Sequence, residues 1–134
     1  MSGLGGFNWL NRYVGIPYKP GGRTREGVDC YGLLVLLFAN EYGINLPDWN
    51  RDWQNLRTRG DHIDAVMHTG QWSPLEEPRD GCIAVVAGRR APYHLGLYFG
   101  GGVIHAREET GVLFQMLDEF EQTAGNVTFG WWRP

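Results

Sequence analysis

The segment from Asp29 to Gly43 constrains the fold more than any other part of the chain. It contains an unbroken run of apolar residues from 33 to 39, with Asp29 ahead of it and Gly43 behind it. Aspartate is a preferred residue at a helix N-cap, and glycine is preferred just past a helix C-terminus. A helix that is apolar on most of its faces has to be buried. The sequence therefore predicts a central, buried helix from Cys30 to Tyr42, with Cys30 in its first turn.

The chain on either side of this helix is less regular. Apolar residues at helical spacing between Phe7 and Val14 predict a short amphipathic helix that ends at Gly15. Residues 17–27 are rich in glycine and in charge and predict a long loop. Long loops in compact domains often carry function. Between residues 46 and 72 the pattern is mixed, and we expect helix and loop there.

From Asp80 onward, short apolar runs alternate with glycine, which is typical of β-strands. Five strands are predicted, namely Cys82 to Ala87, Tyr93 to Phe99, Val103 to Ala106, Val112 to Met116 and Val127 to Trp132. Three consecutive glycines at 100–102 predict a tight turn between the second and third of them. Helices followed by strands indicate an α+β fold, with the central helix packed on an antiparallel sheet. The length of 134 residues predicts a single domain spanning residues 1–134.

Composition excludes several classes of protein. The net charge of −3 provides no basic stripe of the kind that binds nucleic acid. No run of apolar residues is long enough to span a membrane. The first residues, Met1 to Gly6, lack the basic start and apolar run of a signal peptide. We therefore expect synthesis in the cytoplasm, with any export by another route.

Cys30 is the candidate nucleophile. A free thiol is mostly protonated at neutral pH, and the N–H groups at a helix N-terminus favour the thiolate. Gly32, two residues further on, is expected to keep the approach to the sulfur open. The alternative interpretation is that Cys30 is only a small apolar residue at the start of a buried helix.

Two histidines support the catalytic interpretation of Cys30. Thiolate catalysis needs an imidazole within hydrogen-bond reach to accept and return the proton. His94 lies on the second predicted strand, and His105 ends the strand that follows the glycine turn, so the hairpin brings them close together. A polar group beside the base can orient it and fix its tautomer. We therefore expect Cys30, His94 and His105 to form a catalytic triad.

The same residues leave other interpretations open. Cys30, Cys82, His94 and His105 are the ligand types of a zinc site. Structural zinc sites, however, usually show closely spaced ligand pairs, and the chain has none. Cys82 lies in an apolar run and is predicted to be a buried strand residue. A disulfide between Cys30 and Cys82 is also open from the sequence, and it would block the nucleophile.

Four motifs in sequence order resemble the NlpC-type cysteine endopeptidases, which are papain-like enzymes of bacterial cell-wall turnover. The motifs are Val28–Leu33, with its Asp-Cys pair, Pro78–Gly81, His94–Tyr98 and Ile104–Ala106. The resemblance extends over nearly the whole chain. Two further segments, Gly15–Arg23 and Gly130–Pro134, resemble the branch of this family found in phage tails and prophages.

The resemblance implies a papain-like fold and hydrolysis of an amide in the peptidoglycan stem peptide, typically next to D-glutamate and a diamino acid. Cys30 would be the nucleophile, His94 the base and His105 the residue that orients the base. No metal or cofactor is implied. The implied partners are the peptidoglycan stem peptide and other phage tail proteins. The implied location is a virion, from which the enzyme acts in the periplasm or the cell wall.

The resemblance also implies three residues that bind substrate. Tyr18 matches a tyrosine that lines the site near the nucleophile. Asp29 matches an acidic position that helps to bind the amino end of the substrate. Tyr31 stands where many relatives have serine, so it adds bulk and is expected to alter substrate preference.

Two other functional classes remain alternatives. An acyltransferase or deamidase on the same fold would form the same thioester and pass it to a different acceptor. A structural or binding module of a phage tail tip would need no activity. The intact set of Cys30, His94 and His105 argues against such a module, because binding does not require all three residues.

Overall fold

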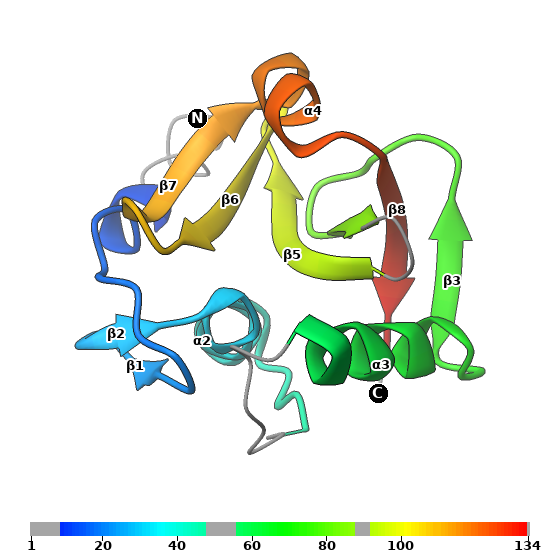
Figure 1. Cartoon of the computed structure of the whole chain (residues 1–134), viewed down its shortest axis with the longest axis horizontal. Helices are drawn as coiled ribbons and strands as arrows, with labels where there is room; N and C mark the ends of the chain where they lie inside the picture. Colours follow the sequence, from blue (N-terminus) through cyan, green and yellow to red (C-terminus); the bar gives the residue numbers. More distant parts are fainter. Residues whose placement is uncertain (1–8, 48–55, 88–91, 134) are drawn as a thin grey trace.

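A computed structural model describes residues 9–47, 56–87 and 92–133 (Figure 1). Phe7, at the start of the expected N-terminal helix, lies outside the described residues. The part of this helix that the structure describes is a single 3₁₀ turn, η1 (Trp9–Arg12), and not an α-helix. The helix η1 buries Leu10. No helix in the described residues is long and apolar enough to cross a membrane.

The centre of the molecule is a six-stranded antiparallel sheet in the order β3-β8-β4-β5-β6-β7. Its strands are β3 (Trp72–Leu75), β4 (Ile83–Ala87), β5 (Pro92–Phe99), β6 (Gly102–Arg107), β7 (Gly111–Met116) and β8 (Val127–Trp132). Five of them confirm the predicted strands, with ends that differ by at most one residue. The sixth, β3, was not predicted. It is an edge strand that contains Pro74, and proline is tolerated in a sheet at such an edge.

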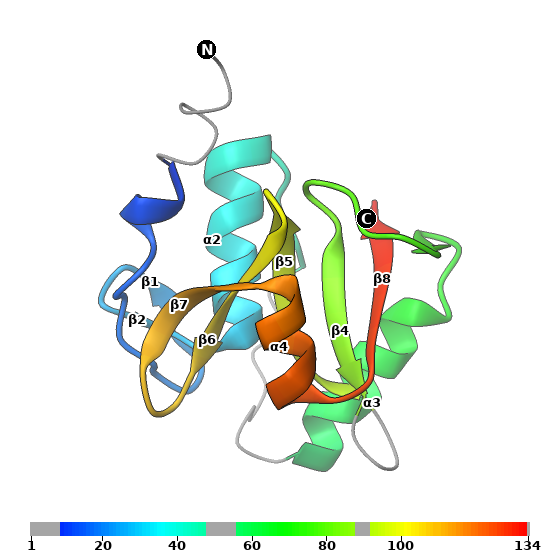
Figure 2. The ribbon, with the colours of Figure 1, turned by 90° about the horizontal axis from the view of Figure 1, so that it is seen from above.

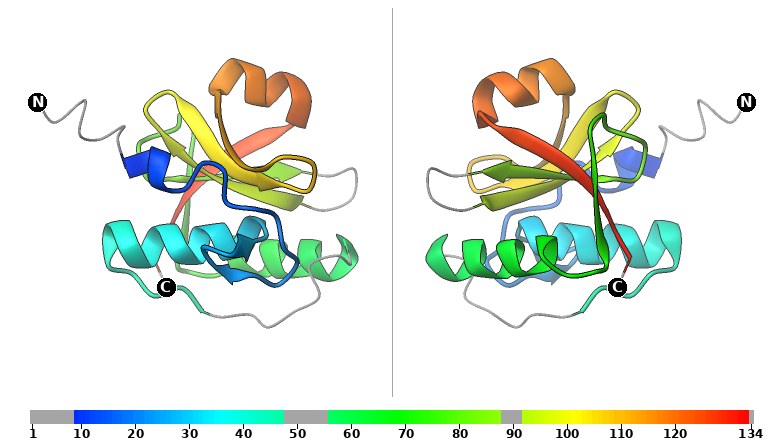
Figure 3. Two further views of the ribbon diagram at one scale, coloured as in Figure 1. Left: turned by 90° about the vertical axis from the view of Figure 1, so that its left-hand side faces the viewer. Right: turned by 90° about the vertical axis from the view of Figure 1, so that its right-hand side faces the viewer.

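Helices cover both faces of the sheet (Figure 3). Helices α2 (Cys30–Tyr42) and α3 (Leu56–Met67) lie on one face, and α4 (Leu117–Ala124) lies on the other. Residues of β4 alternate between the two resulting cores. Ile83 and Val85 join the core under α2, whereas Ala84 and Val86 join the core that contains Phe120 of α4. This double burial explains why β4 is apolar along its whole length.

Helix α2 confirms the prediction for residues 30–42. Asp29 is its N-cap, with a side-chain oxygen that accepts a hydrogen bond from the Gly32 N–H at 2.7 Å. Gly43 ends the helix with φ +67°, a left-handed conformation that glycine adopts without strain. Both leucines of the first turns, Leu33 and Leu34, are buried.

The predicted loop at residues 17–27 contains a small hairpin of β1 (Arg23–Thr24) and β2 (Gly27–Val28), which lies beside the start of α2 (Figure 2). A Cβ atom on Gly32 would lie 1.9 Å from the carbonyl oxygen of Gly22 in this loop. Glycine at 32 is therefore needed so that the loop can pack against the helix. This close packing, and not access to the sulfur of Cys30, is the reason for glycine at this position.

Candidate active site

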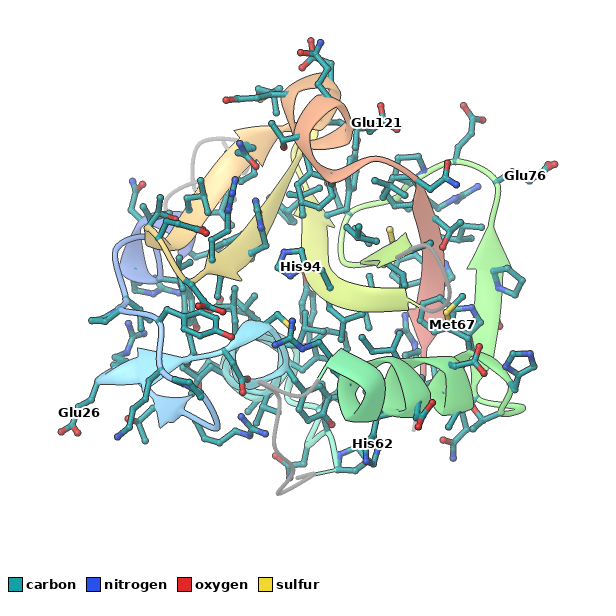
Figure 4. All side chains as sticks on the ribbon, viewed as in Figure 1. Glu26, His62, Met67, Glu76, His94 and Glu121 are labelled. Atoms are coloured by element: carbon teal, nitrogen blue, oxygen red, sulfur yellow. The ribbon has the colours of Figure 1, made fainter. Side chains whose placement is uncertain are left out.

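A cavity of about 320 Å³ lies where the start of α2 meets the sheet and α4. Next to their connecting turn, residues 97–99 of β5 pair with residues 102–104 of β6. Farther from the turn, the two strands diverge (Figure 1). The wall of the cavity includes Tyr18, Cys30, Arg59, His94, His105 and Phe120. Figure 4 shows the His94 ring between the sheet and α2. Four of the six predicted site residues, Tyr18, Cys30, His94 and His105, thus line one cavity, as expected.

Cys30 is buried, with 3% of its surface exposed. Burial raises the pKa of its thiol to about 11. The positive charge of Arg59 and hydrogen bonds from the backbone N–H groups of Leu95 and Tyr31 act in the opposite direction. The sequence predicted a lowered pKa from the helix N-terminus alone, and this was wrong because desolvation outweighs those contributions. In the free protein, Cys30 is therefore a thiol that needs a base.

The two histidines and a glutamine form a chain of hydrogen bonds across three strands. His94 Nε2 lies 3.0 Å from His105 Nδ1, and His105 Nε2 lies 2.8 Å from Gln115 Oε1. His105 on β6 is paired with Leu113 on β7, so Gln115, two residues further along, is its diagonal neighbour on the same face. The ring of Phe120 meets His105 edge-on, with centroids 4.7 Å apart. These contacts hold the His105 ring in place.

Which nitrogen donates in each of these hydrogen bonds follows from the acceptor at the Gln115 end. The amide oxygen of Gln115 accepts a hydrogen bond, so His105 carries its proton on Nε2 and its Nδ1 is an acceptor. His94 Nε2 must then be the donor to His105, which leaves His94 Nδ1 without a proton. Gln115 therefore fixes the tautomer in which His94 can act as a base through Nδ1.

Both histidines are uncharged at neutral pH. The pKa of His94 is lowered to about 3, first by burial and then by the charges of His105, Arg59 and Arg107. The pKa of His105 is lowered to about 4 by burial and by Arg107, against a raising effect of the hydrogen bond that His105 donates to Gln115. A neutral imidazole is the form that accepts a proton, so His94 is in the protonation state that a base requires.

The three residues that were expected to bind substrate have different positions. Tyr18 is half-buried and lines the cavity, as expected. Asp29 is fully buried and does not line the cavity, because its carboxylate accepts hydrogen bonds from the N–H groups of Gly32 at 2.7 Å and Gly21 at 2.8 Å. It also forms an ion pair with Arg23 at 3.1 Å. The structure thus gives Asp29 the task of joining the loop to α2, which corrects the expected contact with substrate.

Tyr31 also points away from the cavity. Its side chain is fully buried, its hydroxyl donates to the carbonyl of Pro47, and its ring packs on Trp132. It faces a second, small and apolar cavity between α2, α3 and the sheet. The expected contact of Tyr31 with substrate is therefore replaced by a role in the core.

The structure also bears on the alternatives for the cysteines. Cys30 and Cys82 are both free thiols, and Cys82 lies in the core under α4. Within the described ranges, no group of three His, Cys, Asp or Glu side chains is arranged to hold a metal ion. Cys30 lines the cavity together with His94 and His105, whereas Cys82 does not.

Two residues of the site were missed from the sequence. Gln115 could have been found from strand alternation, because it is a polar residue in the apolar strand β7 that pairs with the strand of His105. Arg59 lies in a segment with several arginines, and nothing in the sequence distinguishes it from them. Its proximity to Cys30 arises only when α3 packs against β5.

The fold matches solved structures along almost its whole length. The NlpC/p60 domain of the peptidoglycan hydrolase SagA superposes with a TM-score of 0.64 at 19% identity, covering 98% of both chains. NlpC1 of Trichomonas vaginalis also gives a TM-score of 0.64 at 22% identity, over 95% of this chain and 43% of that one. These neighbours confirm the α+β, papain-like fold.

The sequence comparison is more specific. Residues 15–127 match the model of the NlpC/P60 family, so the chain belongs to this family. It is 24% identical over 108 residues to the murein DD-endopeptidase MepS/murein LD-carboxypeptidase of Escherichia coli K12, covering 80% of this chain and 50% of that protein. It is 32% identical over 109 residues to the gamma-D-glutamyl-L-lysine dipeptidyl-peptidase of Bacillus subtilis 168, and the match covers 78% of this chain and 32% of that protein. The chain thus spans about half of the first relative and about a third of the second.

Proposed function

We propose that this chain is a cysteine peptidase that hydrolyses amide bonds in peptidoglycan stem peptides. The observation that carries the proposal is the cavity in which Cys30 lies together with the hydrogen-bonded chain of His94, His105 and Gln115. The family supports the type of substrate, because the relatives are named for the cleavage of murein and of a γ-D-glutamyl peptide.

The reaction would begin with transfer of the Cys30 proton to His94 Nδ1, and the thiolate would attack the carbonyl carbon of the scissile amide. Backbone N–H groups at the start of α2, including that of Cys30, would stabilise the oxyanion. Collapse of the tetrahedral intermediate breaks the C–N bond while His94 returns its proton to the leaving amine. Because burial disfavours each charge alone, thiolate and imidazolium have to form together as an ion pair.

The second half of the reaction releases the acyl group. His94 Nδ1 would take a proton from water, and the resulting hydroxide attacks the thioester at Cys30. His94 then returns the proton to the sulfur, so the free acid leaves and the starting state is restored. Throughout, His105 would hold the ring of His94 by accepting its Nε2–H. This reaction would use the side chains of Cys30, His94 and His105, the backbone N–H groups at the start of α2, and water.

The setting in which the enzyme acts is a separate part of the proposal. The resemblance of Gly15–Arg23 and Gly130–Pro134 to phage-tail forms supports an enzyme that is carried by a virion and acts in the periplasm or the cell wall. This setting stays a prediction. A direct check is whether an antibody against the chain detects it in purified phage particles after induction of the host strain.

The catalytic proposal is tested by hydrolysis of purified peptidoglycan and of a soluble stem peptide. New amines are counted and the products are identified by mass spectrometry. We expect Cys30→Ala and His94→Ala to fall to background. Cys82→Ser is the matched control, since it changes the other buried thiol, which does not line the cavity, and it should keep activity once it is shown to be folded.

Two outcomes would contradict this proposal. If Cys30→Ala released as much amine as the wild type, the nucleophile would be a different group. If a product formed only when an amine acceptor was added, the enzyme would be an acyltransferase and not a hydrolase.

A further inference from the structure

Arg59 is a buried arginine in the wall of the candidate active site. It lies on α3, and 9% of its surface is exposed. Among the described residues, the other buried polar or charged side chains are Asp29, His105 and Gln115, so Arg59 is the one buried cation. It lines the same cavity as Cys30 and His94. The proposed chemistry uses Cys30, His94, His105 and Gln115, and it does not require this charge.

The positive charge of Arg59 reaches the reacting groups. It acts to lower the pKa of His94 in the same direction as burial, and it acts against burial, which raises the pKa of Cys30 and of Tyr18. All three residues line the cavity with Arg59. A guanidinium stays charged in a protein, and its removal from water is costly. A group with these properties in the wall of a cavity is suited to an anion that enters the cavity.

The other charged residues of the cavity differ from Arg59 in position. Arg107, Glu108 and Glu109 come from the end of β6 and the turn that follows. Arg107 is paired with Glu109 at 3.4 Å, with 40% and 70% of their side-chain surfaces exposed. The rim of the cavity therefore carries both signs of charge in contact with water, whereas the buried part of the wall carries the positive charge of Arg59.

The shape of the guanidinium selects the kind of anion. Its planar fork of N–H donors matches a carboxylate, with two parallel hydrogen bonds. The cavity of about 320 Å³ has room for an amino-acid residue beside the nucleophile. An anion held by Arg59 would lie close to the carbonyl that Cys30 attacks.

We propose that Arg59 binds a substrate carboxylate next to the scissile bond and so makes the enzyme prefer acidic over amidated stem peptides. This proposal rests on the proposed function. In a stem peptide, D-glutamate is linked through its side-chain carboxyl, so its α-carboxylate lies a short carbon chain away from that amide. When this carboxylate is amidated, the residue is D-isoglutamine, which has the same shape but no charge.

The experiment uses two soluble stem peptides that differ only in D-glutamate or D-isoglutamine. The measured quantity is the ratio of kcat/KM for the acid to kcat/KM for the amide. Both peptides meet the same Cys30 and His94, so any effect of Arg59 on the nucleophile cancels in this ratio. A hydrogen bond between charged groups, here the guanidinium of Arg59 and the carboxylate of the substrate, is worth enough free energy that we expect a ratio of about ten or more in the wild type.

The variants assign that preference to one residue. Arg59→Gln should reduce the ratio to about one, and Arg59→Lys should give an intermediate value because it keeps the charge and loses the fork. Arg107→Gln is the matched control, since it removes an exposed arginine from the same cavity, and its ratio should equal that of the wild type.

Several outcomes would overturn the proposal. If Arg59→Gln does not fold, the wild-type ratio alone tests the proposal. Equal kcat/KM for the acid and the amide peptide in the wild type rules out a carboxylate site. An unchanged ratio in folded Arg59→Gln also rules it out. If no stem peptide is hydrolysed at all, the proposed function fails, and the carboxylate site is tested separately by calorimetry with Cys30→Ala. In that case, equal affinity for the acid and the amide peptide overturns it.

Discussion

Replacement of Gln115 tests the hydrogen-bond chain most directly. Gln115→Met keeps the volume of the side chain and removes the acceptor for His105 Nε2–H. His105 can then carry its proton on Nδ1 and donate to His94 Nε2. In that arrangement His94 has its proton on Nδ1 and cannot act as a base. The expected defect is thus a loss of the productive tautomer and not a loss of the catalytic groups themselves.

The magnitude follows from the strength of one hydrogen bond. A hydrogen bond between neutral groups contributes about 1 kcal/mol net, which corresponds to a fall of about five- to tenfold in the productive tautomer and in kcat/KM. Because Gln115 is buried, leaving Nε2 of His105 without a partner should also lower the free energy of unfolding by about 1–3 kcal/mol.

Gln115→Glu tests the same hydrogen bond by favouring the positively charged form of His105. A carboxylate at this position accepts the same hydrogen bond but raises the pKa of His105 above its value of about 4. Protonated His105 carries a hydrogen on both ring nitrogens, so His94 Nε2 would have to accept and its Nδ1 would be blocked. The acid limb of the pH profile of kcat/KM should therefore move to higher pH.

The assay combines pH profiles with ¹⁵N chemical shifts of the imidazole nitrogens, which report directly where each proton resides. A purely structural role for Gln115 would lower stability but move neither the acid limb nor the tautomers. If Gln115→Met keeps wild-type kcat/KM and wild-type ring shifts, or if Gln115→Glu leaves the acid limb in place, the reasoning is refuted.

Two further predictions concern stability. Asp29→Ala should lower the free energy of unfolding by about 2–4 kcal/mol in urea denaturation, because it removes the cap of α2 together with the bonds to Gly21 and Arg23. Asp29→Asn, which can still cap the helix, should lose less, and an unchanged KM in folded Asp29→Asn would support the role of joining the loop to α2. The folded pKa values of about 3 for His94 and about 4 for His105 lie below the ordinary 6.5, so the unfolded chain binds more protons between these values. Stability from this source is therefore present above pH 6.5 and is lost as the pH falls, by about 1.4 kcal/mol per pH unit for each histidine, down to about 4 for His105 and about 3 for His94. Denaturation at pH 7 and pH 5 measures this slope, and a His105→Gln variant with an equal slope would contradict the assignment to His105.

The parts of the fold that could be predicted are those specified by neighbouring residues. Helix α2 was predicted to the residue, because its cap, its apolar run and its terminal glycine are all local signals. Helix α4 was missed because it has only eight residues, although Leu117, Phe120 and Ala124 lie at helical spacing and pack in one core. Strand β3 was missed because an exposed edge strand with Pro74 lacks a regular alternation.

The site was predictable to the extent that its chemistry depends on residue type. Cys30 at a helix start and two histidines flanking a glycine turn were enough to predict their proximity. The cap formed by Asp29 was predicted, but its bonds to Gly21 and Arg23 were not, because these residues lie in a loop without regular pattern. The packing of Tyr31 on Trp132 was not predicted either, because Trp132 is remote in the sequence. Arg59 shows the same limit, since a guanidinium on α3 reaches Cys30 only through tertiary packing.

The divergence of β5 and β6 means that the two histidines belong to different pairs of strands. His94 is paired with Val86 on β4, and His105 is paired with Leu113 on β7. The turn after β6, which carries Glu108 and Glu109 to the rim, is connected to the His105 pair alone. Changes of length or charge in this turn can therefore accumulate during evolution without altering the strand pairing that supports His94. The strands that position the ring of His94 are therefore separate from the turn that carries the charged rim, and the hydrogen bond to His105 is what connects the two.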